Sequence, residues 1–259
     1  MKAKNDGGGL RNIALRISYD GTDFLGWQRQ CGSGAGKGRT VQEEIEKALA
    51  KMHDHPVSLI GSGRTDSGVH AAGQVANFYT DISGIAPPRF INALNSMLPK
   101  DIRIMAAHEV PQAFHSRFDA RSRTYRYFIY CGAHPLAHEM PYIWHLGRWP
   151  DVYRINAMAS YLSGEIDCST FTASGDQSRT HFRYLYGANF YPDGERLVFE
   201  ITANAFLWRM VRSIAGTIIF LDERKFAPEE FARRLASLDR LEAGPTAPGN
   251  GLFLWDIKY

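Results

Sequence analysis

Hydrophobic and polar residues alternate along the segment that follows the N-terminal tail. Within residues 11–19, apolar side chains occupy every second position, at Ile13, Leu15, Ile17 and Tyr19. The positions between them hold Asn12, Ala14, Arg16 and Ser18. A period of two is typical of a strand with one buried face. We therefore expect a half-buried strand, with the second set of residues facing away from the core.

Helical spacing follows in several later segments. Thr40 and Glu43 form a capping-box pattern, and the apolar residues after them predict a helix from residue 41 to 52. Pro87 begins a second helical stretch, which Pro99 ends, and Asp151 caps a third, which Gly164 closes. Two further helices are expected at residues 207–220 and 228–238.

The remaining apolar segments are rich in aromatic and β-branched residues, which favour strands. We expect these strands at residues 57–60, 74–79, 102–107, 125–130, 183–191, 196–203 and 252–259. Strands and helices thus occur in both halves of the chain, without a sequence repeat. The pattern predicts an α+β protein of two similar α/β halves. We expect a disordered or non-native tail at residues 1–10, an N-terminal domain at 11–112 and a C-terminal domain at 113–259.

Composition limits the class of protein. The chain has 259 residues, of which 44% are hydrophobic, so a substantial core can form. No apolar run approaches about eighteen residues, so we expect no membrane span. Cysteines at 31, 131 and 168 form no close pair, so neither a disulfide framework nor a zinc knuckle is expected, and a cytoplasmic location fits. The net charge of +3 does not by itself indicate nucleic-acid binding.

One acid stands out in a glycine-rich loop. Asp66 lies among the glycines of residues 61–73 and directly follows Arg64 and Thr65. Glycines allow a positive φ and a close approach to a ligand, and a carboxylate beside a fixed cation stays ionised. These residues predict a site, although a surface turn has the same composition. His70 is a possible general base, but we favour a role in packing or capping the loop.

Arginines cluster with aromatic residues in the middle of the chain. The first cluster contains Arg117, Phe118, Arg121, Arg123, Tyr125, Arg126 and Tyr127. Arg209 and Arg212 form a second, smaller cluster. This mixture suits phosphate contact with base stacking, while a solvated strand edge with ordinary cross-strand pairs is equally compatible.

Two other patterns resemble a nucleotide site and a metal site, but each lacks residues that such a site needs. Residues 32–37 resemble a phosphate-binding loop, but Cys31 and Gly38 occupy positions that need glycine and Ser or Thr, so no nucleotide cofactor is expected. His134 and His138 have no third ligand, so no metal is expected. Tryptophans 27 and 208 are interpreted as core or interface residues rather than stacking platforms.

Several motifs together resemble the TruA family of tRNA pseudouridine synthases. The acid loop, Gly63 to His70, is similar to the family's catalytic segment. Further similar segments run in family order along nearly the whole chain, at residues 19–21 with 26–30, 114–117 with 125–127, 206–212 with Gly216, and 244–248 with 251–252. The chain departs from the family at the glycine-rich residues 32–38, at Cys168, and at Trp208 with Arg209, where the family often has two histidines.

The resemblance implies an activity. The enzyme would isomerise uridine to pseudouridine in the anticodon stem-loop of tRNA, at tRNA positions 38, 39 and 40. It would work as a homodimer without metal or cofactor, with a cleft between two halves around a curved, mainly antiparallel sheet. A tRNA-binding module without turnover is an alternative that the sequence leaves open, and a nucleotide-hydrolysing enzyme is a weaker one.

The resemblance also implies roles for individual residues. Asp66 would be the nucleophile or an ion-stabilising base, and Arg212 its ion-pair partner. Tyr125 would stack on the uracil and help to remove the C5 proton. Arg64 would hold the flipped nucleotide. Further RNA contacts are expected from Arg123, Arg126 and Arg209.

Overall fold

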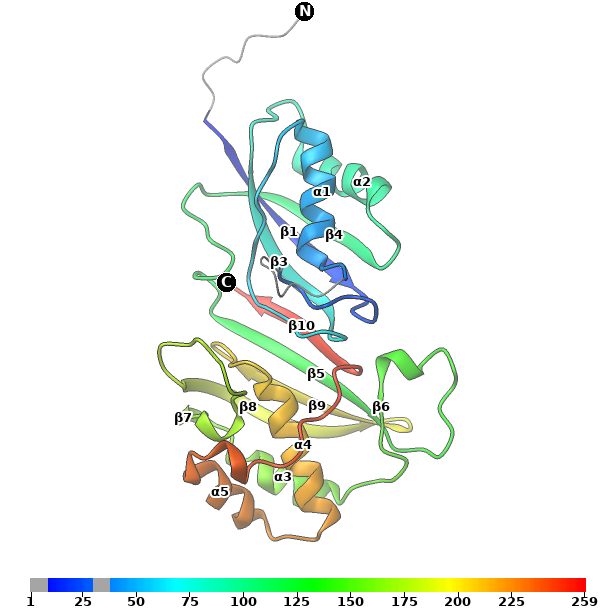
Figure 1. Ribbon diagram of the computed structural model, residues 1–259, viewed down its shortest axis with the longest axis vertical. Helices are drawn as coiled ribbons and strands as arrows, with labels where there is room; N and C mark the ends of the chain where they lie inside the picture. Colours follow the sequence, from blue (N-terminus) through cyan, green and yellow to red (C-terminus); the bar gives the residue numbers. More distant parts are fainter. Residues whose placement is uncertain (1–8, 30–37) are drawn as a thin grey trace, which may run out of the picture. The chain divides into compact units, whose positions relative to one another are not determined.

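The computed structural model describes residues 9–29 and 38–259, so most of the glycine-rich segment 32–38 lies outside the described residues. The chain divides into two compact units, of which the first runs to Ala120 and includes Tyr259, and the second is Arg121–Lys258 (Figure 1). Both units combine helices with mainly antiparallel strands, which confirms the α+β class. No helix in the described ranges is long and apolar enough to cross a membrane.

The first unit is an antiparallel sheet covered by two helices. Its strands lie in the order β4-β1-β3, with β2 added to β3, and they span Ile102–Val110 (β4), Arg11–Tyr19 (β1), His70–Thr80 (β3) and Ile60–Gly61 (β2). Helices α1 (Val41–His53) and α2 (Pro87–Met97) begin at the capping threonine and the proline that the sequence indicated. Both pack on the buried Phe78, since the rings of His53 and Phe90 lie 6.1 and 5.6 Å from its ring.

A buried polar network corrects one expectation. Asn12 was placed on the solvent face of its strand, but it is fully buried. Its amide donates to the carbonyls of Pro111 and Phe114 and accepts from Asn77, whose own oxygen accepts the N–H of Ser116. These bonds tie residues 111–116 to the first unit. The first unit runs to Ala120, whereas a domain boundary was expected at residue 112.

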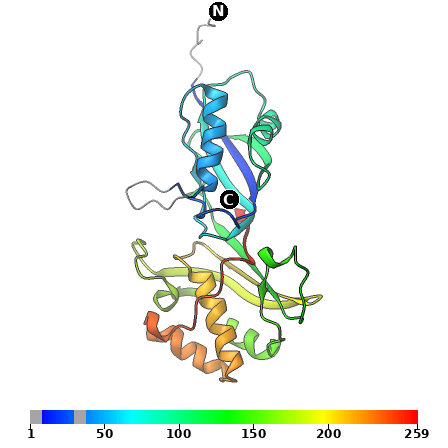
Figure 2. The same cartoon turned by 45° about the vertical axis from the view of Figure 1, so that its right-hand side comes forward.

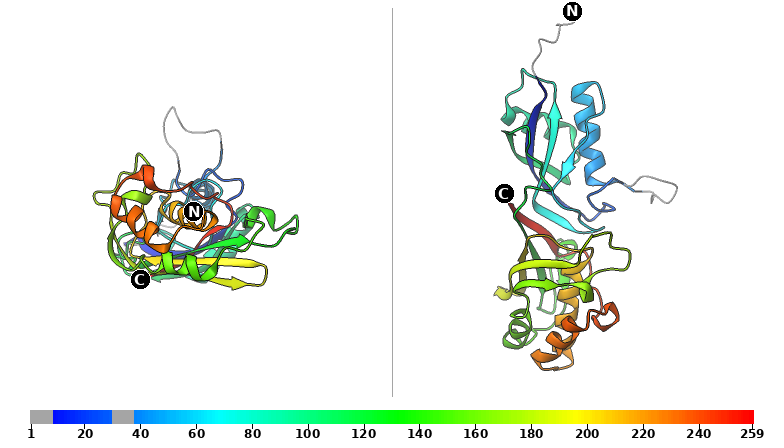
Figure 3. Two further views of the ribbon diagram at one scale, coloured as in Figure 1. Left: turned by 90° about the horizontal axis from the view of Figure 1, so that it is seen from below. Right: turned by 90° about the vertical axis from the view of Figure 1, so that its left-hand side faces the viewer.

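The second unit has a larger antiparallel sheet in the order β10-β5-β9-β8-β7, with the short β6 parallel to β5. The strands span Leu252–Lys258 (β10), Ser122–Tyr130 (β5), Arg196–Ala203 (β9), Phe182–Asp193 (β8), Gly164–Asp167 (β7) and Trp144–His145 (β6). Helices α3 (Val152–Ala159), α4 (Met210–Glu223) and α5 (Pro228–Ser237) gather on one face of this sheet (Figures 2 and 3). Three short 3-10 turns complete it, at Met140–Tyr142, Ser169–Phe171 and Arg240–Glu242.

Several elements of the second unit differ from the expectation. The two-residue strand β6 was not predicted, and α3 ends at Ala159 rather than near Gly164. Helix α4 begins at Met210 rather than Leu207, because Arg209 adopts a left-handed conformation with φ of 60° and interrupts the helix there. Strand β7 was not predicted, since its four residues, Gly164–Asp167, carry too little periodicity. In the first unit, the strand expected at residues 57–60 is reduced to Ile60–Gly61.

Candidate active site

The backbone of the Asp66 loop is fixed by the turn that follows β1. The N–H of Trp27 donates to the carbonyl of Thr65 at 3.2 Å, and the N–H of Gly68 donates to the carbonyl of Phe24 at 3.4 Å. Residues on both sides of Asp66 are thus anchored to residues 24–27. The Asp66 carbonyl itself accepts the N–H of Val69 at 3.2 Å in a tight turn, in which Gly68 has a φ of 76°.

Glycines in this turn are required by close approach. A Cβ on Gly21 would lie 2.0 Å from the carbonyl oxygen of Val69. A Cβ on Gly26 would lie 2.4 Å from the carbonyl oxygen of Thr65, and its φ of 99° also favours glycine. The motif near residue 21 and the acid loop, distant in sequence, therefore form one packed structure.

A buried hydroxyl pair supports the residue next to Asp66. The Tyr19 hydroxyl and the Thr65 side chain lie 2.8 Å apart, and both residues are buried. The ring of Trp27 lies 5.9 Å from that of Tyr19 and is 2% exposed, which confirms Trp27 as a core residue. Asp66 itself is half-buried and Arg64 is exposed. The loop therefore presents a carboxylate and a guanidinium from a rigid base.

His70 packs the loop. It is fully buried, and its Nδ1 accepts the N–H of Gly21 at 2.9 Å. The Asp20 carboxylate lies 3.2 Å from the same nitrogen. The favoured interpretation of His70, as a residue that packs or caps the loop, matches this position.

Strand β5 carries the expected aromatic and basic residues on one buried face. Arg123, Tyr125 and Tyr127 alternate with more exposed positions, as the sequence predicted. The Tyr125 ring meets Phe206 edge-on at 5.1 Å, and the Arg123 guanidinium donates to the carbonyl of Asn204 at 2.7 Å. This face is therefore ordered by contacts with the segment that precedes α4.

Arg126 lies on the opposite face of β5 from Tyr125. Its Nε donates to the Glu200 carboxylate at 2.6 Å, and its guanidinium lies 4.3 Å from the ring centroid of Trp255. The structure does not bring Arg126 together with Tyr125. Its positive charge is paired with Glu200, so any RNA contact of Arg126 would be made on this other face of the strand.

Arg212 is oriented by the loop that precedes β10. It lies in the first turn of α4, and its Nε donates to the carbonyl of Ala247 at 2.8 Å. The N–H of Ala247 donates in return to the Arg212 carbonyl at 3.1 Å. A Cβ on Gly216 would lie 1.9 Å from the carbonyl oxygen of Pro245, so this glycine is needed for the loop to lie on the helix. The buried Tyr127 hydroxyl donates to the carbonyl of Pro248.

Trp208, interpreted from the sequence as a core or interface residue, is not a core residue. It is 44% exposed, because it precedes the helix in an irregular segment and lies outside the buried stripe of α4. The guanidinium of Arg209, also exposed, lies 5.0 Å from its ring centroid. Of the expected site residues, Arg64 and Asp66 belong to the first unit, whereas Arg123, Tyr125, Arg209 and Arg212 belong to the second.

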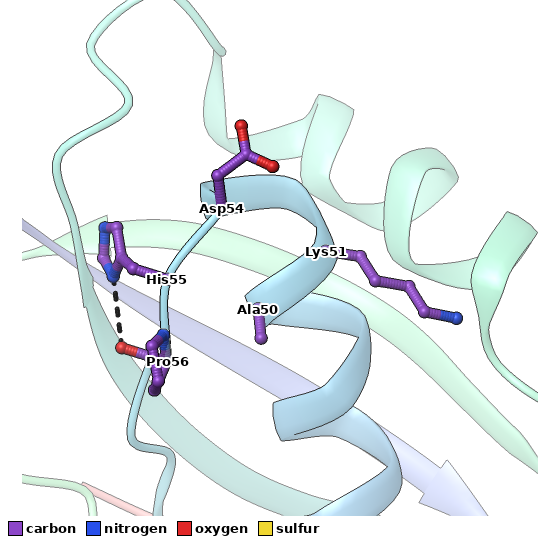
Figure 4. A pocket seen from close by; sticks show the side chains of 5 residues that line it. All are labelled: Ala50, Lys51, Asp54, His55 and Pro56. Atoms are coloured by element: carbon purple, nitrogen blue, oxygen red, sulfur yellow. Dashed lines mark hydrogen bonds between the residues drawn. The ribbon is translucent and has the colours of Figure 1, made fainter.

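Other candidate groups do not form a site with these residues. A pocket at the end of α1 is lined by Ala50, Lys51, Asp54, His55 and Pro56, and no expected site residue lines it (Figure 4). Among the described residues, no group of three or more histidines, cysteines or acids could hold a metal ion. Burial raises the pKa of Cys131 to about 11 and that of Cys168 to about 12, so neither thiol is a ready nucleophile.

Comparison with known proteins gives a consistent result. A family model described as tRNA pseudouridine synthase matches residues 16–119 and 158–259, which include Arg64, Asp66, Arg209 and Arg212, while Tyr125 falls between the two matched segments. The tRNA pseudouridine synthase A of Treponema denticola is 57% identical over 249 residues, covering 96% of this chain and 93% of that protein. The proteins of the same name from Treponema pallidum (strain Nichols) and Ruminiclostridium cellulolyticum are 48% and 42% identical, covering 91% and 96% of this chain and 84% and 100% of their own.

Proposed function

Because the chain belongs to the TruA family of tRNA pseudouridine synthases, isomerases that modify tRNA uridines, we propose that Asp66 supplies the carboxylate that carries the reaction. The observation that supports this role best is the packing around Asp66. Its neighbours Thr65 and Gly68 are hydrogen-bonded to the turn after β1, while Asp66 itself stays half-buried. A catalytic group needs this combination of a fixed backbone and access to substrate.

The reaction rearranges bonds within one nucleotide. The bond from C1′ of the ribose to N1 of uracil breaks, a bond from C1′ to C5 forms, C5 loses a proton and N1 gains one. Atoms and electrons balance without an external donor, so we expect neither a redox cofactor nor a metal. Asp66 acts as the nucleophile, or as a base whose charge stabilises the reacting ion.

Arg212 and Tyr125 complete the proposed site. By family resemblance, Arg212 supplies the positive charge that keeps Asp66 ionised. Tyr125 stacks on the uracil and assists removal of the C5 proton. The hydrogen bond from Arg212 Nε to Ala247 supports this role, because it fixes the direction of the guanidinium. Arg123 and Arg209 supply further contacts to the RNA.

The target uridine must leave its base stack before it reaches a carboxylate, which costs a few kcal/mol. Arg64 is exposed two residues before Asp66, and we assign it the role of holding the everted nucleotide. The proposed substrate region is the anticodon stem-loop of tRNA, at positions 38, 39 and 40. The proposed assembly is a cytoplasmic homodimer.

The proposal is tested by tritium release from tRNA labelled at C5 of uridine. Asp66→Asn should bind this tRNA with unchanged affinity and release no tritium, because the amide cannot act as a nucleophile. Asp23→Asn is the matched control, since it removes an exposed carboxylate from the neighbouring turn. Full release by Asp66→Asn, or equal loss in both variants, would contradict the assignment.

The substrate region needs a separate measurement. Total tRNA from a strain without this enzyme should gain pseudouridine at positions 38, 39 or 40 after incubation with the protein, and at no other position. Modification elsewhere in the tRNA would overturn the assigned region while leaving the role of Asp66 intact.

A further inference from the structure

We propose that Trp208 and Arg209 form a stacking platform for an unpaired nucleobase of the tRNA substrate, outside the catalytic carboxylate loop. The inference rests on the proposed function, because it requires an RNA ligand. It assigns Trp208 a role in binding the RNA, rather than in stabilising the fold or in the reaction itself. The observations that carry it are the exposure of the indole, the support beneath its backbone and the charge beside its ring.

The backbone of Trp208 is held on both sides. Its N–H donates to the Asp176 carboxylate at 2.7 Å, and its carbonyl accepts the N–H of Ala173 at 3.0 Å. The same carboxylate accepts the N–H of Ser178 at 2.8 Å. Burial alone would raise the pKa of Asp176, but the hydrogen bonds from Ser178 and Trp208 outweigh it, and the pKa is lowered. Asp176 therefore stays ionised and holds the loop of residues 173–180 against Trp208.

Gly175 lies on one side of the indole, and much of the rest of the ring is open to solvent. Gly175, with a φ of 91°, lies so close that an added Cβ would be 3.6 Å from the Trp208 ring. Trp208 is 44% exposed, so much of its indole faces solvent. An aromatic ring whose backbone is anchored on both sides and whose face is open to solvent can stack on a nucleobase.

Arg209 adds a cation at the edge of the platform. Its guanidinium lies 5.0 Å from the Trp208 ring centroid, within cation–π range. Its φ of 60° is unfavourable for a residue other than glycine, and such strain is kept where the surrounding structure imposes it. This conformation ends the irregular segment and starts α4, so Trp208 and Arg209 project outside the helix. An aromatic ring with an arginine beside it suits a nucleobase and its phosphate.

The test compares Trp208→Ala, Trp208→Leu and Trp208→Phe with Tyr153→Ala, whose side chain is 92% exposed on α3. Loss of one stacked base should raise KM for tRNA roughly 5- to 150-fold in Trp208→Ala. Trp208→Leu also lacks an aromatic ring, so its KM should rise as well. The Phe variant retains a stacking ring and should recover most of the affinity, and Tyr153→Ala should match wild type. The value of kcat should change little in all four.

A direct readout is the tryptophan fluorescence of the protein on addition of tRNA. Wild type should be quenched, and Trp208→Phe should lose that quench while keeping its affinity. The inference is overturned if Trp208→Ala and Trp208→Leu keep the wild-type KM, or if Phe and Leu behave alike. The Asp66→Asn variant separates the two proposals, since it should be quenched normally and remain inactive.

Discussion

Asp66 and Arg212 are fixed in different ways. The loop of Asp66 is held through its backbone and through the neighbouring Thr65 side chain, which lies 2.8 Å from the Tyr19 hydroxyl. Arg212 is held through its own side chain, whose Nε donates to the carbonyl of Ala247. In both cases the supporting loop approaches so closely that a glycine is required, at Gly21 and Gly216 respectively.

The difference follows from the two side chains. A carboxylate is short, so its position is set mainly by the backbone that carries it. A guanidinium ends a long flexible chain, so one of its donors must be used to choose a direction. We infer that the first unit fixes the place of the negative charge, whereas the second unit fixes the direction of a positive one.

The largest expected effect comes from the two glycines. Gly21→Ala and Gly216→Ala should each lower the free energy of unfolding by about 1–3 kcal/mol or more, because the added methyl meets backbone oxygens rather than a flexible side chain. Urea denaturation of each variant measures the free energy of unfolding. Gly84→Ala is the control, since nothing lies within 4 Å of the added atom. Equal stability of all three variants would refute the close approach of the loops.

Removal of the Tyr19 hydroxyl should affect activity next most strongly. Tyr19→Phe loses the bond to Thr65, and a small displacement of Asp66 should reduce kcat between about 5- and 100-fold. KM for tRNA should not change, because Tyr19 is buried and does not meet the substrate. Tyr79→Phe removes an exposed hydroxyl bond to the Gln112 carbonyl in the same unit and should retain full activity. A rise in KM without loss of kcat would argue against this positioning role.

Removal of the Tyr127 hydroxyl should have a smaller effect. Tyr127→Phe frees the carbonyl of Pro248 and loosens the loop that orients Arg212, so kcat should fall by about fivefold, the equivalent of one hydrogen bond. Tyr130→Phe, on the same strand, removes a hydroxyl bond to Glu195 and should keep the wild-type kcat. Comparable losses in both variants would indicate a general effect on β5 instead.

The smallest effect is a pH dependence of stability. Burial raises the pKa of Tyr127 above its ordinary value, so the folded protein keeps this proton when the unfolded chain begins to lose it. The contribution to stability is therefore complete below about pH 10 and is lost progressively above it. Denaturation at several alkaline pH values should show a steeper decline for wild type than for Tyr127→Phe. Parallel curves would contradict the burial of this hydroxyl.

Much of the fold and the acid loop could be predicted from the sequence, because each depends on local patterns. The alternation in β1, the capping threonine before α1 and the glycines around Asp66 all act on near neighbours in the chain. Asn12 could not be placed, because its burial depends on Asn77 and Pro111, far away in sequence.

The differences at the two arginine clusters have other causes. Trp208 follows the apolar Leu207 and was interpreted as a core or interface residue, but the left-handed Arg209 delays the helix and leaves the indole exposed. Arg126 was grouped with Tyr125 by composition, although adjacent positions on a strand face opposite sides. That alternation was readable from the sequence, and the ion pair with Glu200 was not.

The most direct test of the central claim is a single-turnover reaction with enzyme in excess over tRNA. Asp66→Asn should bind all of the tRNA and form no pseudouridine over hours, whereas wild type should convert it within one turnover. Formation of pseudouridine by the fully bound variant at a rate near that of wild type would show that another group carries the reaction.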